Sequence, residues 1–131
     1  MMPGGRGRGR GGRHGRRRRV MSFLQPCLLV MLHRGPAHGY SLLNGLDEFG
    51  FRPGQLDASL VYRALREMQA AGWAASEWGS ESQGPRRRVY RITTAGQAHL
   101  EEWVADLRRT RQEIDTLVAA FEQIVGKKGV V

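Results

Sequence analysis

The segment 57–93 constrains the fold more than any other part of the chain, and it reads DASLVYRALREMQAAGWAASEWGSESQGPRRRVYRIT. Its first half repeats apolar residues at three- and four-residue intervals, which indicates one apolar stripe on a helix: Leu60, Val61, Ala64, Leu65 and Met68. Asp57 can cap the start of this helix, and Gly72 can adopt the left-handed conformation that ends it. Residues 73–78 and 88–93 then alternate like strands around a loop rich in Gly, Ser and Pro. This order of elements predicts a winged helix.

Cations gather on two parts of this segment. Between its apolar positions, the helix carries a face of donors and cations with little carboxylate: Ser59, Tyr62, Arg63 and Arg66. The loop ends in three consecutive arginines: Arg86, Arg87 and Arg88. Charge runs are often solvated faces, so an exposed helix and a solvated hairpin are the alternative. A basic helix face followed by an arginine run at the base of a hairpin favours nucleic acid.

The net charge of the chain is unevenly distributed. The whole chain of 131 residues carries +9, and residues 1–19 hold eight arginines and no acidic residue, so 9 − 8 leaves +1 for residues 20–131. A segment with strong self-repulsion and no core-forming residues is expected to be disordered, although it can still contact polyanions. A solubilising tail is the alternative interpretation.

Cellular location is predicted from two features. The single cysteine, Cys27, excludes an internal disulfide and suits a reducing compartment. No apolar run reaches the roughly 18–20 residues that a membrane span requires. We therefore expect a cytoplasmic protein without a membrane partner.

Two helices are predicted before the central segment. Residues 22–33 are apolar nearly all round, which indicates a buried helix. Because proline is tolerated only in the first turn of a helix, Pro26 places its start near Leu24 or Gln25. A turn at 34–37 leads to a short helix at 41–49, with Tyr40 and Ser41 at an N-terminus that favours a phosphate. No other metal ligand stands at a suitable spacing near His38, so a structural role in the turn is expected.

The C-terminal segment predicts a long helix from Thr93 or Thr94 to Val125. Eight positions alternate three- and four-residue steps, and all but Thr110 are apolar: Leu100, Trp103, Leu107, Thr110, Ile114, Leu117, Phe121 and Ile124. This is the seam of a coiled coil. Thr94 and Gln97 offer a capping box. A helix of about 30 residues is about 45 Å long, more than a small domain can cover, so pairing of two copies is favoured over folding back.

The chain resembles the PadR family of transcriptional regulators. The matching residues are LLVML in the first helix, GPAHGYSL, VYRALREMQAAGW, GPRRRVYRIT and TAGQAHLEEW, and the resemblance covers about residues 22–125. It implies a homodimeric repressor whose third helix enters the major groove and whose wing contacts the backbone. It also implies a flat apolar effector in some relatives, which Trp103 and Leu107 would face here, although Trp103 also suits a plain interface. The pair Ser59-Leu60 departs from the family pattern, and Leu60 could contact a thymine methyl group or simply pack.

We therefore predict a mainly α protein with a β-hairpin wing and a long C-terminal dimerisation helix. The expected parts are a basic tail (1–19), a DNA-binding winged helix (20–93), the dimerisation helix (94–126) and a short basic end (127–131). No enzyme motif or metal-ligand spacing is present, so neither catalysis nor a cofactor is expected. The rivals are an RNA-binding protein that uses its Arg/Gly-rich tail, and a coiled-coil adaptor that binds no nucleic acid.

Overall fold

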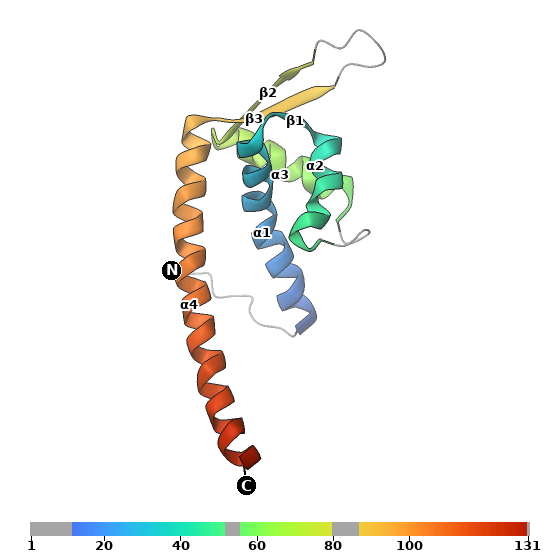
Figure 1. Cartoon of the computed structure of the whole chain (residues 1–131). Helices are drawn as coiled ribbons and strands as arrows, with labels where there is room; N and C mark the ends of the chain where they lie inside the picture. The colour runs from blue at the N-terminus through green and yellow to red at the C-terminus, as the bar shows by residue number, and fades with distance from the viewer. Residues whose placement is uncertain (1–11, 52–55, 80–86, 131) are drawn as a thin grey trace, which may run out of the picture. The chain divides into compact units, whose positions relative to one another are not determined.

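The computed structural model describes residues 12–51, 56–79 and 87–130, and the side chains of 23–51, 56–79 and 87–127. Two compact units divide the chain, Met1–Gln97 and Ala98–Val131. The elements in chain order are α1 (Gly12–Arg34), β1 (Ala37–His38), α2 (Gly39–Gly45), the 3-10 turn η1 (Leu46–Phe49), α3 (Ala58–Ala70), β2 (Ala74–Trp78), β3 (Arg88–Ile92) and α4 (Thr94–Val130) (Figure 1). This confirms the predicted class of a mainly α winged helix with a long C-terminal helix.

Helices α1, α2 and α3 lie together in the first unit (Figure 1). Its core is built from buried side chains, mostly leucines, of α1, α2, η1 and α3. The fully buried side chains are Leu24, Leu28, Leu29, Leu32, Leu42, Leu46, Val61, Leu65 and Met68. Removing this apolar surface from water is the main favourable contribution to folding, at roughly 25 cal/mol per Å². Because the stripe of α3 is buried here, its polar face must point outward.

Both ends of α3 follow the sequence signals. The Asp57 carboxylate accepts a hydrogen bond from the backbone N–H of Leu60 at 3.2 Å, which confirms the predicted cap. At the other end Gly72 has a φ of +86°, a conformation that residues with a Cβ rarely adopt. Its N–H donates to the Gln69 carbonyl, and that of Trp73 donates to the Met68 carbonyl, which is the Schellman pattern. The recognition helix is therefore fixed at both ends by local chemistry.

The sheet has three antiparallel strands in the order β1-β3-β2. In the hairpin, Ser76 pairs with Tyr90 and Trp78 with Arg88. Each hairpin strand is one residue shorter than predicted. Strand β1 was not predicted, because a two-residue strand shows no alternation. Its pairing with β3 is a long-range contact that local sequence does not report.

The beginning of α1 corrects two predictions. The helix starts at Gly12, and Pro26 lies inside it rather than in its first turn. Leu24, Pro26 and Leu28 are all buried, so burial on both sides of the proline offsets the missing backbone hydrogen bond. Residues 12–19, predicted to be disordered, are helical, since extending a formed helix is easier than nucleating one and arginine is a good helix former. Residues 1–11 lie outside the described residues.

Helix α2 also begins earlier than predicted, at Gly39 instead of Ser41, and ends at Gly45 before η1. Of the helices in the described ranges, none has the length and apolarity that a membrane span requires.

The start of α4 corrects the predicted capping box by one residue. Thr93, not Thr94, caps the helix: its Oγ1 accepts a hydrogen bond from the Gly96 N–H at 2.9 Å and donates one to the Gly72 carbonyl at 2.6 Å. Thr93 N–H also donates to the Trp73 carbonyl. A Cβ on Gly96 would lie 2.1 Å from the same Trp73 oxygen, so only glycine fits there. The Thr93 side chain thus links the end of α3 to the start of α4.

We expect Thr93→Val to lower the free energy of unfolding by about 1–2 kcal/mol, because it removes the cap and leaves the Gly72 carbonyl without its donor. Thr94→Val is the matched control, since Thr94 is exposed and is the first helical residue. Urea unfolding of both variants measures the difference. Equal losses would show that Thr93 is not the cap.

Candidate nucleic-acid interface

The outward face of α3 carries the predicted polar residues. Ser59, Arg63 and Arg66 are exposed, and Tyr62 is half-buried. Ser59 donates to the Asp57 carboxylate at 2.7 Å, while the Arg63 guanidinium lies 3.5 Å from Glu67 one turn further along. Leu60 is half-buried at the edge of the apolar stripe, which suits packing and contact with a ligand equally.

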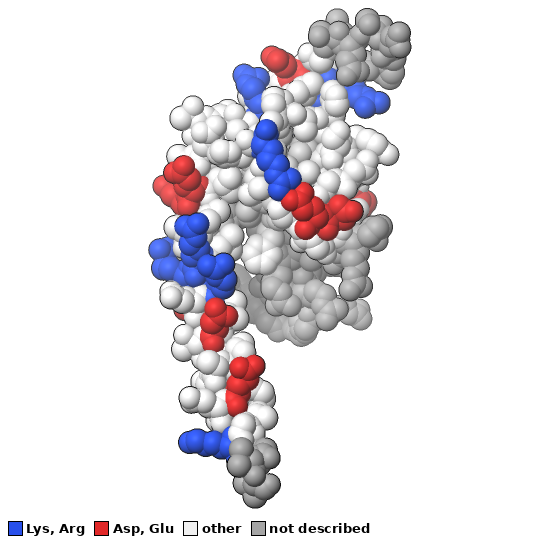
Figure 2. Space-filling model, viewed as in Figure 1, with Lys and Arg blue, Asp and Glu red and all other residues white. Residues whose placement is uncertain are grey.

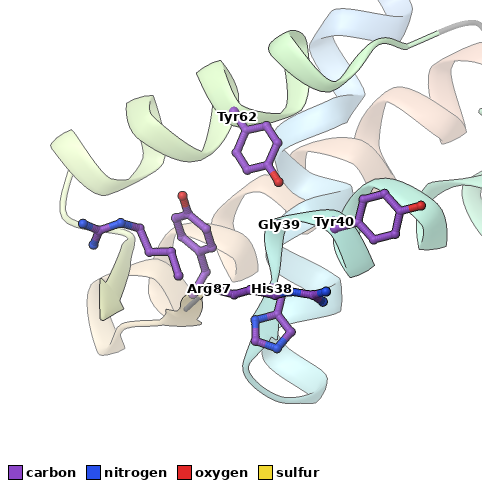
Figure 3. A pocket seen from close by; sticks show the side chains of 7 residues that line it. His38, Gly39, Tyr40, Tyr62 and Arg87 are labelled. Atoms are coloured by element: carbon purple, nitrogen blue, oxygen red, sulfur yellow. The ribbon is translucent and has the colours of Figure 1, made fainter. Parts of the chain in front are cut away.

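Tyr62 is held by a close approach between α2 and α3. Gly39 is buried, and a Cβ there would lie 2.4 Å from a ring carbon of Tyr62. Figure 3 shows the hydroxyl end of Tyr62 directed toward Gly39, whereas Tyr40 extends away from them. The glycine therefore allows the start of α2 to contact the ring. Sequence reasoning did not single out Gly39, although Gly39 lies within GPAHGYSL, one of the segments that carry the family resemblance.

A hollow of about 610 Å³, here named the tyrosine hollow, joins residues from β1, α2, α3 and the start of β3: His38, Gly39, Tyr40, Tyr62, Arg87, Arg88 and Tyr90 (Figure 3). It brings together four predicted site residues that lie far apart in sequence. Tyr40 is 60% exposed, and Ser41 beside it is also exposed. The fold thus places hydroxyl and guanidinium donors from α2, α3 and β3 around one concave surface.

Arg88 is fixed by neighbours that sequence reasoning missed. Its guanidinium carbon lies 4.6 Å from the centre of the Trp78 ring, and its Nη1 donates to Ser76 Oγ at 2.9 Å. Ser76 Oγ in turn donates to Gln69 Oε1 at 3.1 Å. The available signal was the hairpin register, which sets Trp78 opposite Arg88. Arg87 is exposed, and Arg86 lies outside the described residues.

A second hollow of about 600 Å³, here named the arginine hollow, is lined by Arg66, Gln69, Ala70, Arg88 and Tyr90. Burial raises the pKa of the Tyr90 hydroxyl, and the neighbouring Tyr62 raises it further. The positive charges of Arg88 and Arg66 act in the opposite direction on that pKa. Two cations from different elements therefore lie near one buried phenol. In the described part of the chain, no cluster of His, Cys, Asp or Glu could hold a metal ion.

Helix α4 presents the predicted seam residues differently along its length. Leu100 is buried, and Trp103 and Leu107 are half-buried, with the rings of His99 and Trp103 in an edge-to-face contact at 5.1 Å. Beyond them the apolar seam residues are exposed: Ile114 52%, Leu117 70%, Phe121 62% and Ile124 56%. On the face drawn in Figure 2, groups of acidic and basic side chains alternate along this helix. Charges of both signs therefore lie along α4 on this face.

Comparison with known proteins identifies the family. The model of the transcriptional regulator PadR-like family matches residues 28–102, more than half of the chain. A PadR family transcriptional regulator from Eggerthella lenta is 29% identical, with a TM-score of 0.66 over 78% of this chain and 84% of that one. A PadR-like regulator from Bacillus cereus is 25% identical, with a TM-score of 0.68 over 77% and 96% of the two chains.

A conserved protein of unknown function, described as a potential transcriptional factor, is 30% identical and has a TM-score of 0.70 over 90% of this chain and 98% of that one. An uncharacterised protein from Lysinibacillus sphaericus is 21% identical over 79% of this chain and 94% of its own. The match of the family model, with these solved relatives, shows that this chain belongs to the PadR-like family of transcriptional regulators.

Proposed function

We propose that this DNA-binding transcriptional regulator is a homodimeric repressor that lays α3 in the major groove of its operator. The observation that supports this most is that hydroxyl and guanidinium donors from α2, α3 and β3 line one hollow. A concave surface with hydroxyl and guanidinium donors suits the phosphate backbone of duplex DNA. The proposal of repression comes from the family resemblance. Its physical basis is that a dimer bound across a promoter would block other proteins from that promoter.

In this proposal, each group has a role set by its position. Ser59, Tyr62 and Arg63 lie in the N-terminal half of α3, where a recognition helix contacts base edges. Leu60, at the edge of the buried stripe, contacts a thymine methyl group only if the bases of the major groove lie close to this edge of α3. The exposed Tyr40 and Ser41 donate to a phosphate beside the groove.

The wing supplies the remaining contacts in this proposal. Arg87 and Arg88 hold the base of the hairpin on the backbone, and Arg86 precedes them in the sequence. Such contacts fix the register of the protein on the duplex and carry no sequence information.

Pairing through α4 is supported by its exposed apolar stripe. Four large side chains at seam positions are more than half exposed, and Val118 and Val125 beside them are 45% and 47% exposed. Leaving this surface in water is unfavourable, and the heptad spacing suits a second copy of the same helix. We therefore assign DNA binding to residues 20–93 and pairing to residues 94–126.

A small apolar effector would act near the start of α4. Trp103 and Leu107 are half-buried, so they could contact such a molecule between subunits. The contact between the Trp103 and His99 rings equally suits a plain protein interface. Calorimetry with flat aromatic compounds and a Trp103→Ala control would separate these two roles.

We expect Leu117→Glu to separate the dimer and to weaken DNA binding with it, because a carboxylate buried without a partner is costly. Thr116→Glu adds the same charge one residue away, outside the seam, and should leave both properties unchanged. Sedimentation at micromolar concentration measures the oligomeric state. A wild-type monomer under these conditions would contradict the proposed pairing.

We expect Arg63→Ala to narrow the difference in affinity between operator and random DNA by about 1–3 kcal/mol, the contribution of a bidentate base contact. Arg87→Ala should instead weaken binding to both duplexes alike, since it removes a backbone contact. Titrations of both duplexes at one salt concentration measure these effects. An unchanged difference for Arg63→Ala would mean that this face does not read bases.

The operator should be an inverted repeat with half-sites about 34 Å apart, one turn of the double helix, if two recognition helices act on one face of the duplex. Footprinting on the promoter of the protein's own gene tests this spacing. A footprint without two-fold symmetry would count against a symmetric dimer. Tighter binding to single-stranded RNA than to any duplex would instead favour the RNA-binding alternative.

A further inference from the structure

The arginines of the first unit whose side chains the structure describes fall into two groups. Ion pairs within the described residues join three of them to acidic neighbours: Arg34–Glu48, Arg63–Glu67 and Arg91–Glu77. Arg66, Arg87 and Arg88 have no acidic partner of this kind among the described residues, and Arg66 and Arg88 line the arginine hollow. Two cations that share a concave surface without a neutralising acid repel each other, and an anion between them would relieve that repulsion.

Arg88 is prepared to hold such an anion. The Trp78 ring covers one face of its guanidinium, and Ser76 accepts from one of its nitrogens. Because a guanidinium carries five N–H donors, these contacts leave others for a ligand. Ser76 also bonds to Gln69 on α3, so the chain of contacts links the wing to the recognition helix. The entropy of ordering Arg88 is thereby reduced before any ligand arrives.

Arg66 approaches the same place from α3. Arg66, Gln69 and Ala70 are spaced at i, i+3 and i+4, so they share one stripe at the C-terminal half of the helix. Tyr90 of β3 lies between the two hollows, lining both. The position of Arg66 beside the wing differs from that of Arg63, which lies one turn earlier and is paired with Glu67.

We propose that the arginine hollow binds one backbone phosphate of duplex DNA, held jointly by Arg66 and Arg88, with Ser76 and Trp78 positioning Arg88. This inference rests on the proposed function and adds Arg66 to it. Arg66 lies on the helix face predicted from the sequence to contact nucleic acid, and in this inference it contacts the backbone rather than base edges. The C-terminal half of α3 then fixes register while its N-terminal half reads sequence.

The test compares four proteins: wild type, Arg66→Ala, Arg88→Ala and the double variant. Their affinities are measured, over a range of salt, for a duplex carrying the footprinted sequence and for a scrambled duplex of equal composition. Each single substitution should lower the affinity for both duplexes by the same factor, about tenfold, which corresponds to the loss of a charged hydrogen bond. The double variant should lower the slope of log affinity against log salt by about 0.9, which corresponds to one phosphate. Two separate phosphates would lower it by about 1.8.

Arg91→Ala is the matched control. Arg91 lies on the same strand but its side chain alternates to the other face of β3, where it is near Glu77. Its removal should change neither affinity nor slope. Circular dichroism and sedimentation of all variants confirm that fold and oligomeric state are retained.

The positioning role is tested with Ser76→Ala and Trp78→Leu. Each should lower the affinity for both duplexes, but less than Arg88→Ala does. Neither should lower the affinity further in a protein that already carries Arg88→Ala. Trp78→Phe, which keeps a ring face for the guanidinium, should restore most of the affinity lost in Trp78→Leu. The positioning role would be overturned if Ser76→Ala and Trp78→Leu lowered DNA affinity as much in the Arg88→Ala variant as they do in the wild type.

The proposal that Arg66 and Arg88 bind one phosphate would be overturned if Arg66→Ala reduced the preference for the footprinted duplex while Arg88→Ala did not. Arg66 would then read a base, and the protein would still be a DNA-binding regulator. If the wild type left no footprint on its promoter and bound no duplex in titrations, the proposed function and this inference would both be wrong.

Discussion

Burial of the apolar stripe of α3 is the constraint on which the rest of the structure depends. Val61, Leu65 and Met68 are fully buried in the core that α1 also supplies. Once this stripe is inside, the rotation of the helix about its own axis is fixed, and Ser59, Arg63 and Arg66 must face outward. The chemistry of the interface is therefore a consequence of core packing. A core substitution that loosened this packing would therefore change the orientation of the polar face, although every polar side chain would still be present.

Local signals predicted the central segment well, because its boundaries depend on the chemistry of neighbouring residues. Asp57 caps α3 through a backbone N–H three residues away, and Gly72 ends it with a positive φ. The errors arose where distant contacts decide the outcome. The buried surroundings of Pro26 keep it inside a helix, and strand β1 exists only because β3 pairs with it. Thr93 was passed over in favour of Thr94 because its second partner, the Gly72 carbonyl, is remote in sequence.

The candidate site shows the same division. Sequence identified the cations, because arginines between apolar helix positions and at a hairpin base are visible in one dimension. It could not rank them. Arg87 and Arg88 are adjacent and identical in type, yet the register places only Arg88 opposite Trp78. Likewise, Arg63 and Arg66 both lie on the exposed face, but only the former has a carboxylate one turn away. Such differences depend on what lies across a strand or along a helix.

The charge of the folded part supports a local rather than a global account of DNA affinity. Residues 20–131 sum to only +1, so the net charge of this part can steer a polyanion only weakly. Ion pairs neutralise arginines such as Arg34 at the surface, away from both hollows. The arginines that line the hollows have no ion-pair partner among the residues whose side chains the structure describes. Because salt screens an exposed cation beyond a short range, we expect affinity to depend on the fit of the duplex at these positions.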